Sequence, residues 1–301
     1  MKFEVEKVES FTGHKDCVYN VCGSTDSHKF FSSAGDGLIV EWDSRIPDLG
    51  KPLAQMQHSV YALHLEKEDN LLWVGDNFEG IRSFDLISRK ETGSLALNKA
   101  AIFDIKTYNS NVFIAGGDGV ITVVDKENLA FKKHLKSSSK SVRALAINPV
   151  ERELAAGYSD HTIRIFDLNS FELKKQINAH RNSVFTLAYS PNFESLYSGS
   201  RDAHIKNWNI QNNYELAEQV IGHMYTINHI SFSPAGKLFA TCSMDKSIKI
   251  WDSAQMKLLK VLDQTRHAGH GTSVNRLHWL SDESLVSASD DRSLSLWKIG
   301  Q

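Results

Sequence analysis

The sequence predicts an all-β fold made of seven repeats, each holding about four short strands. Three observations support this prediction: a motif recurs seven times, its copies are evenly spaced, and apolar residues alternate with polar ones within each copy. Repeats at a period of roughly 20–50 residues indicate an architecture in which neighbouring units stack on one another. The 301 residues therefore divide better into seven units than into two ordinary domains.

The repeated motif has small residues, an Asp, and an alternating apolar stretch that ends in an aromatic position. Five clear copies contain SSAGDGLIVEWD, AAGYSDHTIRIFD, SGSRDAHIKNWN, TCSMDKSIKIWD and SASDDRSLSLWK, and their aromatic residues are Trp42, Phe166, Trp208, Trp251 and Trp297. Two weaker copies, GDNFEGIRSFD and AGGDGVITVVD, place Phe84 and Val124 at the same position. Successive aromatic positions lie 42, 40, 42, 42, 43 and 46 residues apart, a regularity that chance does not produce.

Other residues follow the same phase. Six copies have an Asp six residues before the aromatic position, whereas the second copy has Phe78 there; the six are Asp36, Asp118, Asp160, Asp202, Asp245 and Asp291. Four copies have a His after Gly or Ala, 27 or 28 residues before the aromatic position; these are His14, His180, His223 and His270. The repeat therefore specifies polar residues as well as apolar ones.

Within a repeat the apolar period is two. The stretches IRIFD, IKIWD and LSLWK alternate as half-buried strands do, and Gly, Asn, Asp and Ser separate short strands every 8–12 residues or so. The sequence contains no convincing amphipathic helix. A four-stranded unit of this length cannot bury its faces alone, so we expect the seven units to stack into one body.

Composition excludes several classes. Lys and Arg number 34 against 36 Asp and Glu, giving a net charge of −2 and no overall drive toward nucleic acid or anionic membrane. The longest apolar run, residues 112–117, is far shorter than the roughly 20 residues of a membrane helix. The N-terminal residues lack the apolar core of a secretory signal, and three cysteines fit a reducing compartment. We therefore expect a cytoplasmic protein.

At this point the sequence resembles the WD-repeat family, whose signature is Gly-His followed by Trp-Asp within 40–45 residues or so. The resemblance covers essentially all 301 residues. It implies a seven-bladed β-propeller, with four antiparallel strands in each blade around a central channel. We expect residues 1–301 to form this single propeller. Residues 3–10 should supply the last strand of the final blade and close the ring, which leaves no open sheet edge.

The resemblance also implies a series of linked hydrogen bonds in four of the repeats. Trp donates its indole N–H to a hydroxyl, the hydroxyl donates to His, and His donates to Asp, so each polar group is satisfied. The four quartets are His14, Ser32, Asp36 and Trp42; His180, Ser198, Asp202 and Trp208; His223, Thr241, Asp245 and Trp251; and His270, Ser287, Asp291 and Trp297.

Ser, His and Asp in one line also suggest a hydrolase triad. We favour the structural interpretation, because a catalytic site is needed once and this arrangement occurs four times. In addition, each hydroxyl is committed to a neighbouring side chain, and no oxyanion-type glycine turn accompanies any copy. We therefore expect no catalytic residues.

Repeats two, three and four lack the full quartet. Copy two has His58 at a shifted position and no turn Asp, copy three lacks both His and the aromatic residue, and copy four has Ala156 in place of the hydroxyl. We expect neither a metal site nor a cofactor, because His267 and His270 have no ligand cluster beside them and the Cys17–Cys22 pair stands alone. The basic residues 132–140 are best explained as a solvated outer strand and loop.

By resemblance, partners bind at the channel mouth, on the face that carries the turn Asp and the Gly-His loops. The residues expected there follow the Val or Ile of each first strand, or precede the turn Asp; they are Tyr19, Tyr61, Phe103, Arg143, Phe185, Arg201, Asn228, Met244, Asn275 and Asp290. Aromatic residues and Arg dominate binding hot spots, so the first five form the strongest candidate. The alternative is that these side chains only plug the channel. The surface suggests a peptide with an apolar or aromatic anchor and a basic group nearby.

The leading functional hypothesis is a non-enzymatic scaffold that binds proteins or peptides, with no direct nucleic-acid or membrane binding, as a monomeric propeller within a complex. The alternative is a substrate-recruiting subunit of a larger enzymatic or nucleic-acid-processing complex, which a pull-down with mass spectrometry would distinguish. A third possibility, an enzyme with its site in the channel, would need carboxylates or histidines that converge on the axis.

Overall fold

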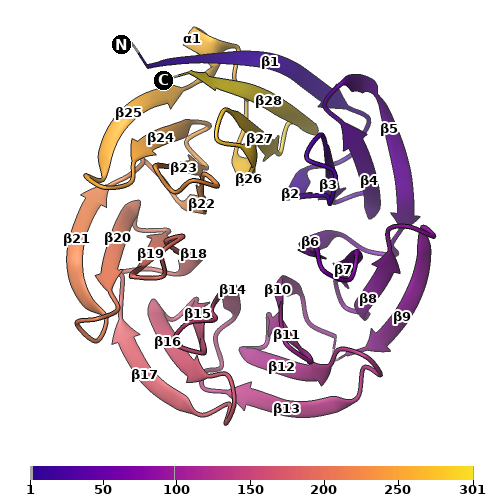
Figure 1. The fold of residues 1–301 in the computed structure, drawn as a ribbon, viewed down its shortest axis with the longest axis vertical. Coiled ribbons are helices and arrows are strands. Elements are labelled where there is room, and N and C mark those ends of the chain that lie inside the picture. The colour runs from indigo at the N-terminus through magenta and orange to yellow at the C-terminus, as the bar shows by residue number, and fades with distance from the viewer. Residues whose placement is uncertain (1–2, 98, 301) are drawn as a thin grey trace.

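The protein forms seven four-stranded antiparallel sheets arranged as blades around a central channel (Figure 1). This computed structural model describes residues 3–97 and 99–300. The all-β fold expected from the repeats and the seven-bladed propeller implied by the resemblance are therefore confirmed. Blades 1 to 7 follow the sequence, and each blade lists its strands from the channel outward: blade 1, β2 (Val18–Gly23), β3 (Lys29–Ala34), β4 (Leu38–Asp43) and β5 (Ile46–Gln55); blade 2, β6 (Val60–Glu66), β7 (Leu71–Asp76), β8 (Gly80–Asp85) and β9 (Lys90–Ala96); blade 3, β10 (Ile102–Tyr108), β11 (Asn111–Gly116), β12 (Val120–Asp125) and β13 (Phe131–Lys136); blade 4, β14 (Val142–Asn148), β15 (Glu153–Tyr158), β16 (Thr162–Asp167) and β17 (Leu173–Asn178); blade 5, β18 (Val184–Tyr189), β19 (Ser195–Ser200), β20 (His204–Asn209) and β21 (Glu215–Ile221); blade 6, β22 (Ile227–Phe232), β23 (Leu238–Ser243), β24 (Ile248–Asp252) and β25 (Lys257–Leu262); blade 7, β26 (Val274–Ser281), β27 (Ser284–Ser289), β28 (Ser293–Gly300) and β1 (Glu4–Thr12).

Blade 7 is closed by the two ends of the polypeptide. The N-terminal strand β1 lies outside β28 and pairs with it antiparallel, from Glu4 opposite Gly300 to Thr12 opposite Ser293 (Figure 1). The prediction that an N-terminal strand completes the last blade is thus confirmed, and the strand extends two residues further than expected. Because the last strand of the ring comes from the start of the sequence, the closure itself is held by backbone hydrogen bonds.

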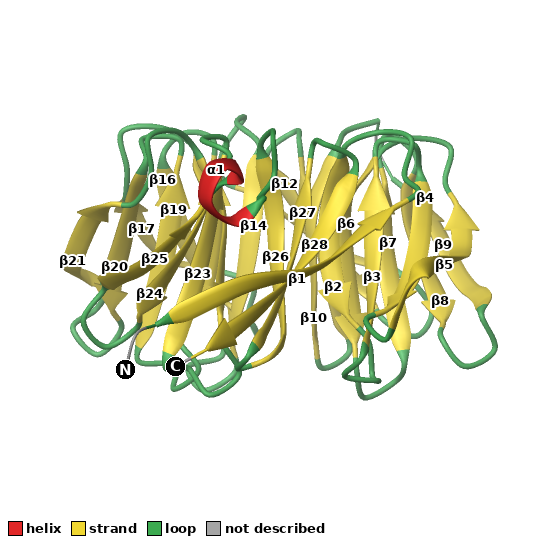
Figure 2. Cartoon of the chain, turned by 90° about the horizontal axis from the view of Figure 1, so that it is seen from above, coloured by secondary structure: helices red, strands yellow, loops and turns green. Residues whose placement is uncertain are grey.

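The single helix of the described residues, α1 (Gln264–His267), is one turn long and lies in the loop that connects β25 to β26. Seen from the side, the strands run between two rims of loops, and α1 lies at one rim (Figure 2). No helix among residues 3–97 and 99–300 has the length and apolar character needed to cross a membrane.

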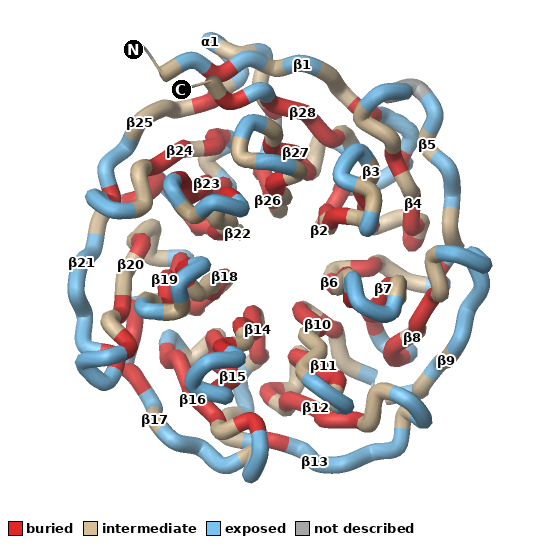
Figure 3. The backbone as a smooth tube through the Cα atoms, viewed as in Figure 1, coloured by how far each residue is buried: buried red, intermediate tan, exposed pale blue. Residues whose placement is uncertain are grey.

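The core lies between the blades. Most buried apolar residues lie on the three inner strands of each blade, whereas the outermost strands are largely exposed and add single buried residues such as Phe11 of β1 and Leu135 of β13 (Figure 3). Each cluster joins two neighbours; for example, Phe31 and Ile39 of blade 1 pack with Val60 and Leu72 of blade 2. Full burial of such a side chain contributes roughly 1.5–3 kcal/mol. The stability of one blade therefore depends on the next.

Every innermost strand carries a β-bulge near its start. The register shifts between Val18 and Asn20 in β2 and at the equivalent place in the six other first strands. The extra residue of a bulge lies outside the ladder, and its side chain is re-aimed. In blades 1 to 3 these extra residues are Tyr19, Tyr61 and Phe103. The bulge is therefore the backbone feature that turns these side chains toward the channel mouth.

Candidate functional site

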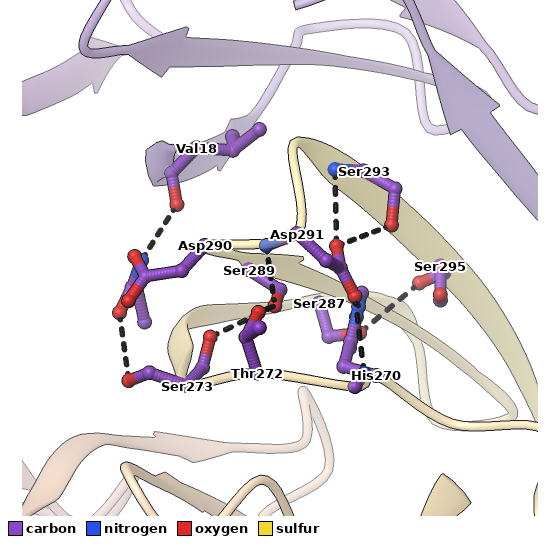
Figure 4. Close-up of polar contacts among 12 residues, drawn as sticks. Val18, His270, Thr272, Ser273, Ser287, Ser289, Asp290, Asp291, Ser293 and Ser295 are labelled. Carbon is purple, nitrogen blue, oxygen red and sulfur yellow. Dashed lines mark hydrogen bonds and ion pairs between the residues drawn. The ribbon is translucent and has the colours of Figure 1, made fainter. Parts of the chain in front are cut away.

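The hydrogen-bonded quartet of blade 7 runs from Trp297 to Asp291. Figure 4 labels its Ser287, His270 and Asp291. The indole N–H of Trp297 donates to Ser287 Oγ over 2.9 Å, Ser287 Oγ lies 2.8 Å from His270 Nε2, and His270 Nδ1 lies 2.8 Å from Asp291 Oδ2. A carboxylate beside Nδ1 places the imidazole proton on that nitrogen, so Nε2 accepts from the serine.

The same geometry occurs in blades 1, 5 and 6. The hydroxyls of Ser32, Ser198 and Thr241 each accept from the blade's Trp over 2.7–2.9 Å and lie 2.7–2.8 Å from the blade's His. The three Nδ1–carboxylate distances, to Asp36, Asp202 and Asp245, are 3.2, 3.1 and 2.9 Å. The structure thus brings together all sixteen residues of the four predicted quartets.

Each quartet Asp also fixes the loop beside it. Asp245 accepts from the backbone N–H of Met224 and from both the backbone N–H and the hydroxyl of Ser247. Burial alone would raise the pKa of Asp245, but its hydrogen bond with His223 and these further donors hold the pKa well below its usual range. Burial lowers the pKa of His223, against the raising effect of Asp245. The quartet therefore holds a neutral imidazole against a carboxylate.

The quartet hydroxyls offer no accessible nucleophile. Ser32, Ser198, Thr241 and Ser287 are fully buried, and each accepts an indole N–H. A substrate could reach them only if the blade opened. The geometry is that of a satisfied internal network, which is the arrangement buried polar groups require.

Two of the incomplete blades use substitutes that the repeat phase did not indicate. In blade 2, Asp76 is fully buried and accepts from the backbone N–H of His58 over 3.2 Å, two residues away from the expected turn position. In blade 4, Ser138 stands where the His is expected and donates to Asp160 over 2.7 Å, while Arg164 donates to the same carboxylate over 3.0 Å. The turn carboxylate is thus kept although the histidine is lost.

Five of the predicted partner-binding residues form a continuous arc of contacts across blades 1 to 5. The rings of Tyr19 and Tyr61 meet edge to face at 4.7 Å, and Tyr61 stacks on Phe103 at 5.8 Å with an interplanar angle of 7°. The Arg143 guanidinium lies 4.1 Å from the centroid of Phe103 and 5.2 Å from that of Phe185. We name these five residues the aromatic arc.

Blades 6 and 7 close the ring with amide groups that bridge to the next blade. Asn228 Nδ2 donates to Val274 O over 2.8 Å. Asn275 Nδ2 donates to Val18 O over 2.9 Å and to Asp290 Oδ1 over 2.7 Å, and Figure 4 labels these two acceptor residues. The two asparagines therefore form hydrogen bonds that connect neighbouring blades.

A cavity of about 470 Å³ opens at this mouth. Its lining includes the whole aromatic arc together with Asn228 and Asn275, and adds Phe78, Ala101 and Arg276. The other three predicted residues, Arg201, Met244 and Asp290, do not line it. Met244 is instead half-exposed on the rim, beside the exposed Met224 and Tyr225 of the same blade.

A second set of polar residues lies deeper in the channel, where the repeat pattern assigned none. Seven first strands contribute to the channel, and His64, His229, His278, Lys106 and Arg276 line a cavity of about 220 Å³ there. Their only sequence signal is position, because His64, Lys106 and His278 each lie three residues after a residue predicted at the channel mouth. The bulge in each strand places both residues of such a pair on the same side of the strand.

One carboxylate, Asp104, lies against this set. It is buried, accepts from Lys106 Nζ over 2.7 Å and from the backbone N–H of Leu145 over 2.9 Å, and lies 3.9 Å from the Arg276 guanidinium. Burial would raise the pKa of Asp104, but Lys106 and Arg276 lower it. No group of three or more His, Cys, Asp or Glu within residues 3–97 and 99–300 is arranged to hold a metal ion.

Comparison with known proteins places the protein in a class. The family model described as WD domain, G-beta repeat matches residues 5–43, 128–167, 171–209, 215–252 and 258–298. These segments make up more than half of the 301 residues, so the protein belongs to the WD40 family. The unmatched residues 44–127 hold the two repeats with the weakest motifs.

Among solved structures, the protein is similar to the crystal structure of the WD40 beta propeller domain of Doa1. The TM-score is 0.86 with 18% sequence identity, over 98% of this protein and 97% of that one, a likeness that shows the fold alone. No curated protein matched the sequence. The WD40 propeller is a generic protein-interaction scaffold that generally binds other proteins and is typically non-catalytic.

Proposed function

We propose that this propeller is a non-enzymatic scaffold that captures a peptide segment of a partner protein in the cavity at the channel mouth. The observation that carries the proposal is the aromatic arc: five side chains from five blades, all partly exposed, touch one another and line one cavity. Rigid aromatic side chains and Arg are the residues that contribute most to binding hot spots.

Arg143 is the charged residue of the aromatic arc and supplies hydrogen-bond donors to the cavity. Its guanidinium is held between Phe103 and Phe185, and its Nε donates to Ser159 Oγ over 3.1 Å. A planar guanidinium in a fixed position can still bind a carboxylate through its free N–H groups. The cavity is therefore suited to an apolar or aromatic side chain with an acidic group beside it.

This changes one part of the expectation from the sequence, which suggested a basic group in the peptide. The cavity lining contains two arginines, Arg143 and Arg276, and no carboxylate among the described residues. Asp290, the carboxylate expected to attract a basic group, lies outside the lining and accepts a hydrogen bond from Asn275. A cationic peptide group would meet like charges in this cavity, whereas an Asp, a Glu or the carboxyl terminus of a peptide would meet opposite ones.

Peptide display tests the proposal when the partner is not identified in advance. Libraries with free C-termini and with internal random segments would be selected on the wild-type protein, then measured on the double variant Phe103→Ala/Phe185→Ala. We expect enrichment of an aromatic or large aliphatic residue next to a carboxylate, and loss of binding by more than about tenfold in the double variant.

The matched control is Phe131→Ala, which removes an exposed aromatic ring from the outer strand β13. Peptides that bind the double variant as well as they bind wild type would exclude the arc as the site. Equal loss in the Phe131→Ala variant would show that the effect is not local to the mouth.

A further inference from the structure

The deeper channel cavity is small, polar and separate from the aromatic arc. Its volume of about 220 Å³ corresponds to roughly seven water molecules at ~30 Å³ each, enough for a small ion with part of its hydration shell. Its lining runs along the first strands to Gly23, the last residue of β2, and to Lys67, just after β6. The cavity therefore lies toward the rim opposite the Gly-His loops. Arg276 lines both this cavity and the one at the mouth, so it lies between them.

The charges around this cavity do not balance. Its lining contains Lys67, Lys106 and Arg276, and no Asp or Glu among the described residues. Asp104 offsets one of these charges through its ion pair with Lys106 and its approach to Arg276. The Arg276 charge therefore remains inside the cavity without a hydrogen-bonded acidic partner, and Lys67 adds a second positive charge at the exposed end of the lining.

Hydrogen-bond donors in the same cavity have no acceptor. The Arg276 guanidinium makes no hydrogen bond with any residue that the structure describes, and Asp104 at 3.9 Å is beyond hydrogen-bond range. His229 Nδ1 accepts from the backbone N–H of Leu277 over 3.3 Å, so the neutral ring carries its proton on Nε2. His278, also in the lining, makes no side-chain hydrogen bond within residues 3–97 and 99–300.

We propose that this cavity binds a tetrahedral oxyanion, of the size and charge of phosphate or sulfate. Arg276 supplies a guanidinium fork, Lys106 and Lys67 supply positive charge, and His229 and His278 supply ring N–H groups. The ligand is either the free ion or a phosphoryl group carried on a small molecule. This site goes beyond peptide binding at the mouth and does not depend on it.

The state of the histidines supports the proposal. Burial, and then Lys106, lower the pKa of His64 to about 3, while burial, Lys67 and Arg276 lower the pKa of His278 to about 4. Burial followed by the repulsion of Arg276 and Lys106 holds the pKa of His229 well below its usual range. A bound dianion would reverse this repulsion, so these rings report directly on occupancy.

The experiment is a titration of the purified protein with inorganic phosphate, followed by calorimetry and by histidine ring NMR, at ionic strength held constant with chloride. We expect saturable heat and shifts of the His64, His229 and His278 ring signals. The rings of His180 and His223, which are buried in quartets and bonded at both nitrogens, should not move.

Three variants locate the effect. Arg276→Gln should weaken phosphate binding by about tenfold or more, since it removes a charge-assisted donor. Lys67→Met, an exposed residue whose loss does not threaten folding, should weaken it about threefold. Lys257→Met, an exposed lysine on the outer strand β25, removes the same charge elsewhere and should leave binding unchanged.

A parallel titration with glycerol 3-phosphate separates the two sources of the oxyanion. Tighter binding of inorganic phosphate identifies the free ion, and tighter binding of the ester identifies a carried phosphoryl group; both should be lost in Arg276→Gln. Absence of saturable binding at millimolar phosphate would overturn the proposal. So would binding that Arg276→Gln and Lys257→Met weaken equally. Peptide capture at the aromatic arc is unaffected by either result.

Discussion

Removal of the quartet carboxylate in blade 6 is the perturbation whose cost the structure specifies best. In an Asp245→Ala variant, four donor groups lose this acceptor: the ring of His223, the backbone N–H of Met224, and both the N–H and the hydroxyl of Ser247. Only the His223 ring and the Ser247 hydroxyl, whose Nδ1 and Oγ are 3.2 Å apart, can still bond to each other. The His223 side chain is fully buried and the Asp245 side chain is 7% exposed, so water replaces little of what is lost. The variant therefore keeps buried donors, among them the backbone N–H of Ser247, that have lost their acceptor.

The expected destabilisation is about 3–5 kcal/mol, because each buried donor left without an acceptor costs about 1–3 kcal/mol and more than one is lost here. For a protein of this length one kcal/mol shifts Tm by about 2 °C, so Tm should fall by about 6–10 °C. The assay is thermal unfolding by calorimetry and circular dichroism at pH 7. The Asp245→Asn variant, which keeps one acceptor oxygen, should lie between Asp245→Ala and wild type.

The control is Glu172→Ala, which removes an exposed carboxylate near β17 and should change Tm by about 1 °C or less. If Asp245→Ala melts within about 1 °C of wild type, the quartet does not stabilise its blade and the structural reasoning is refuted.

Three other predictions follow from the same geometry. Ala156→Ser in blade 4 should lower the free energy of unfolding by about 1–3 kcal/mol in denaturant titrations. The new hydroxyl would be buried, and Phe166, which stands in place of the Trp, has no N–H to donate to it. Gly80→Ala should lower Tm by several degrees, since φ is +153° and a Cβ would come within 2.0 Å of the Leu95 carbonyl oxygen; an unchanged Tm would argue against this turn. The free energy of unfolding should decrease as the pH drops below about 6.5, because histidines in the unfolded protein take up protons that buried neutral rings such as His223 do not. It should decrease again below about pH 4, because carboxylates of the unfolded protein take up protons while those with a lowered pKa, such as Asp245, stay ionised. A flat profile from pH 8 to 3 would contradict both shifts.

The fold could be predicted from the sequence because the repeated residues show the length and the number of the repeats directly. The Asp, His and aromatic residues recur at fixed separations, so blade number and closure by the N-terminal strand could be predicted from spacing and family resemblance. The aromatic arc could be selected in the same way, since Tyr19, Tyr61 and Phe103 follow the same first-strand position in consecutive repeats.

Features out of phase with the repeat could not be predicted. Asp76 stands two residues before the expected turn position, and Ser138 replaces a His with a residue too common to carry a signal. The channel histidines could not be predicted, because period-two alternation places His64 on the opposite side of the strand from Tyr61. The bulge inserts an extra residue that brings the two side chains to the same side, and the residue types do not indicate where a bulge occurs.

The central claim is that partners bind at the channel mouth through the aromatic arc. The most direct test is a crystal structure of the protein with a peptide selected by display. We predict that an apolar or aromatic side chain of the peptide packs between Tyr61, Phe103 and Phe185, with a carboxylate on the Arg143 guanidinium. A peptide bound along an outer strand or at the opposite rim, with the arc unchanged, would contradict this claim.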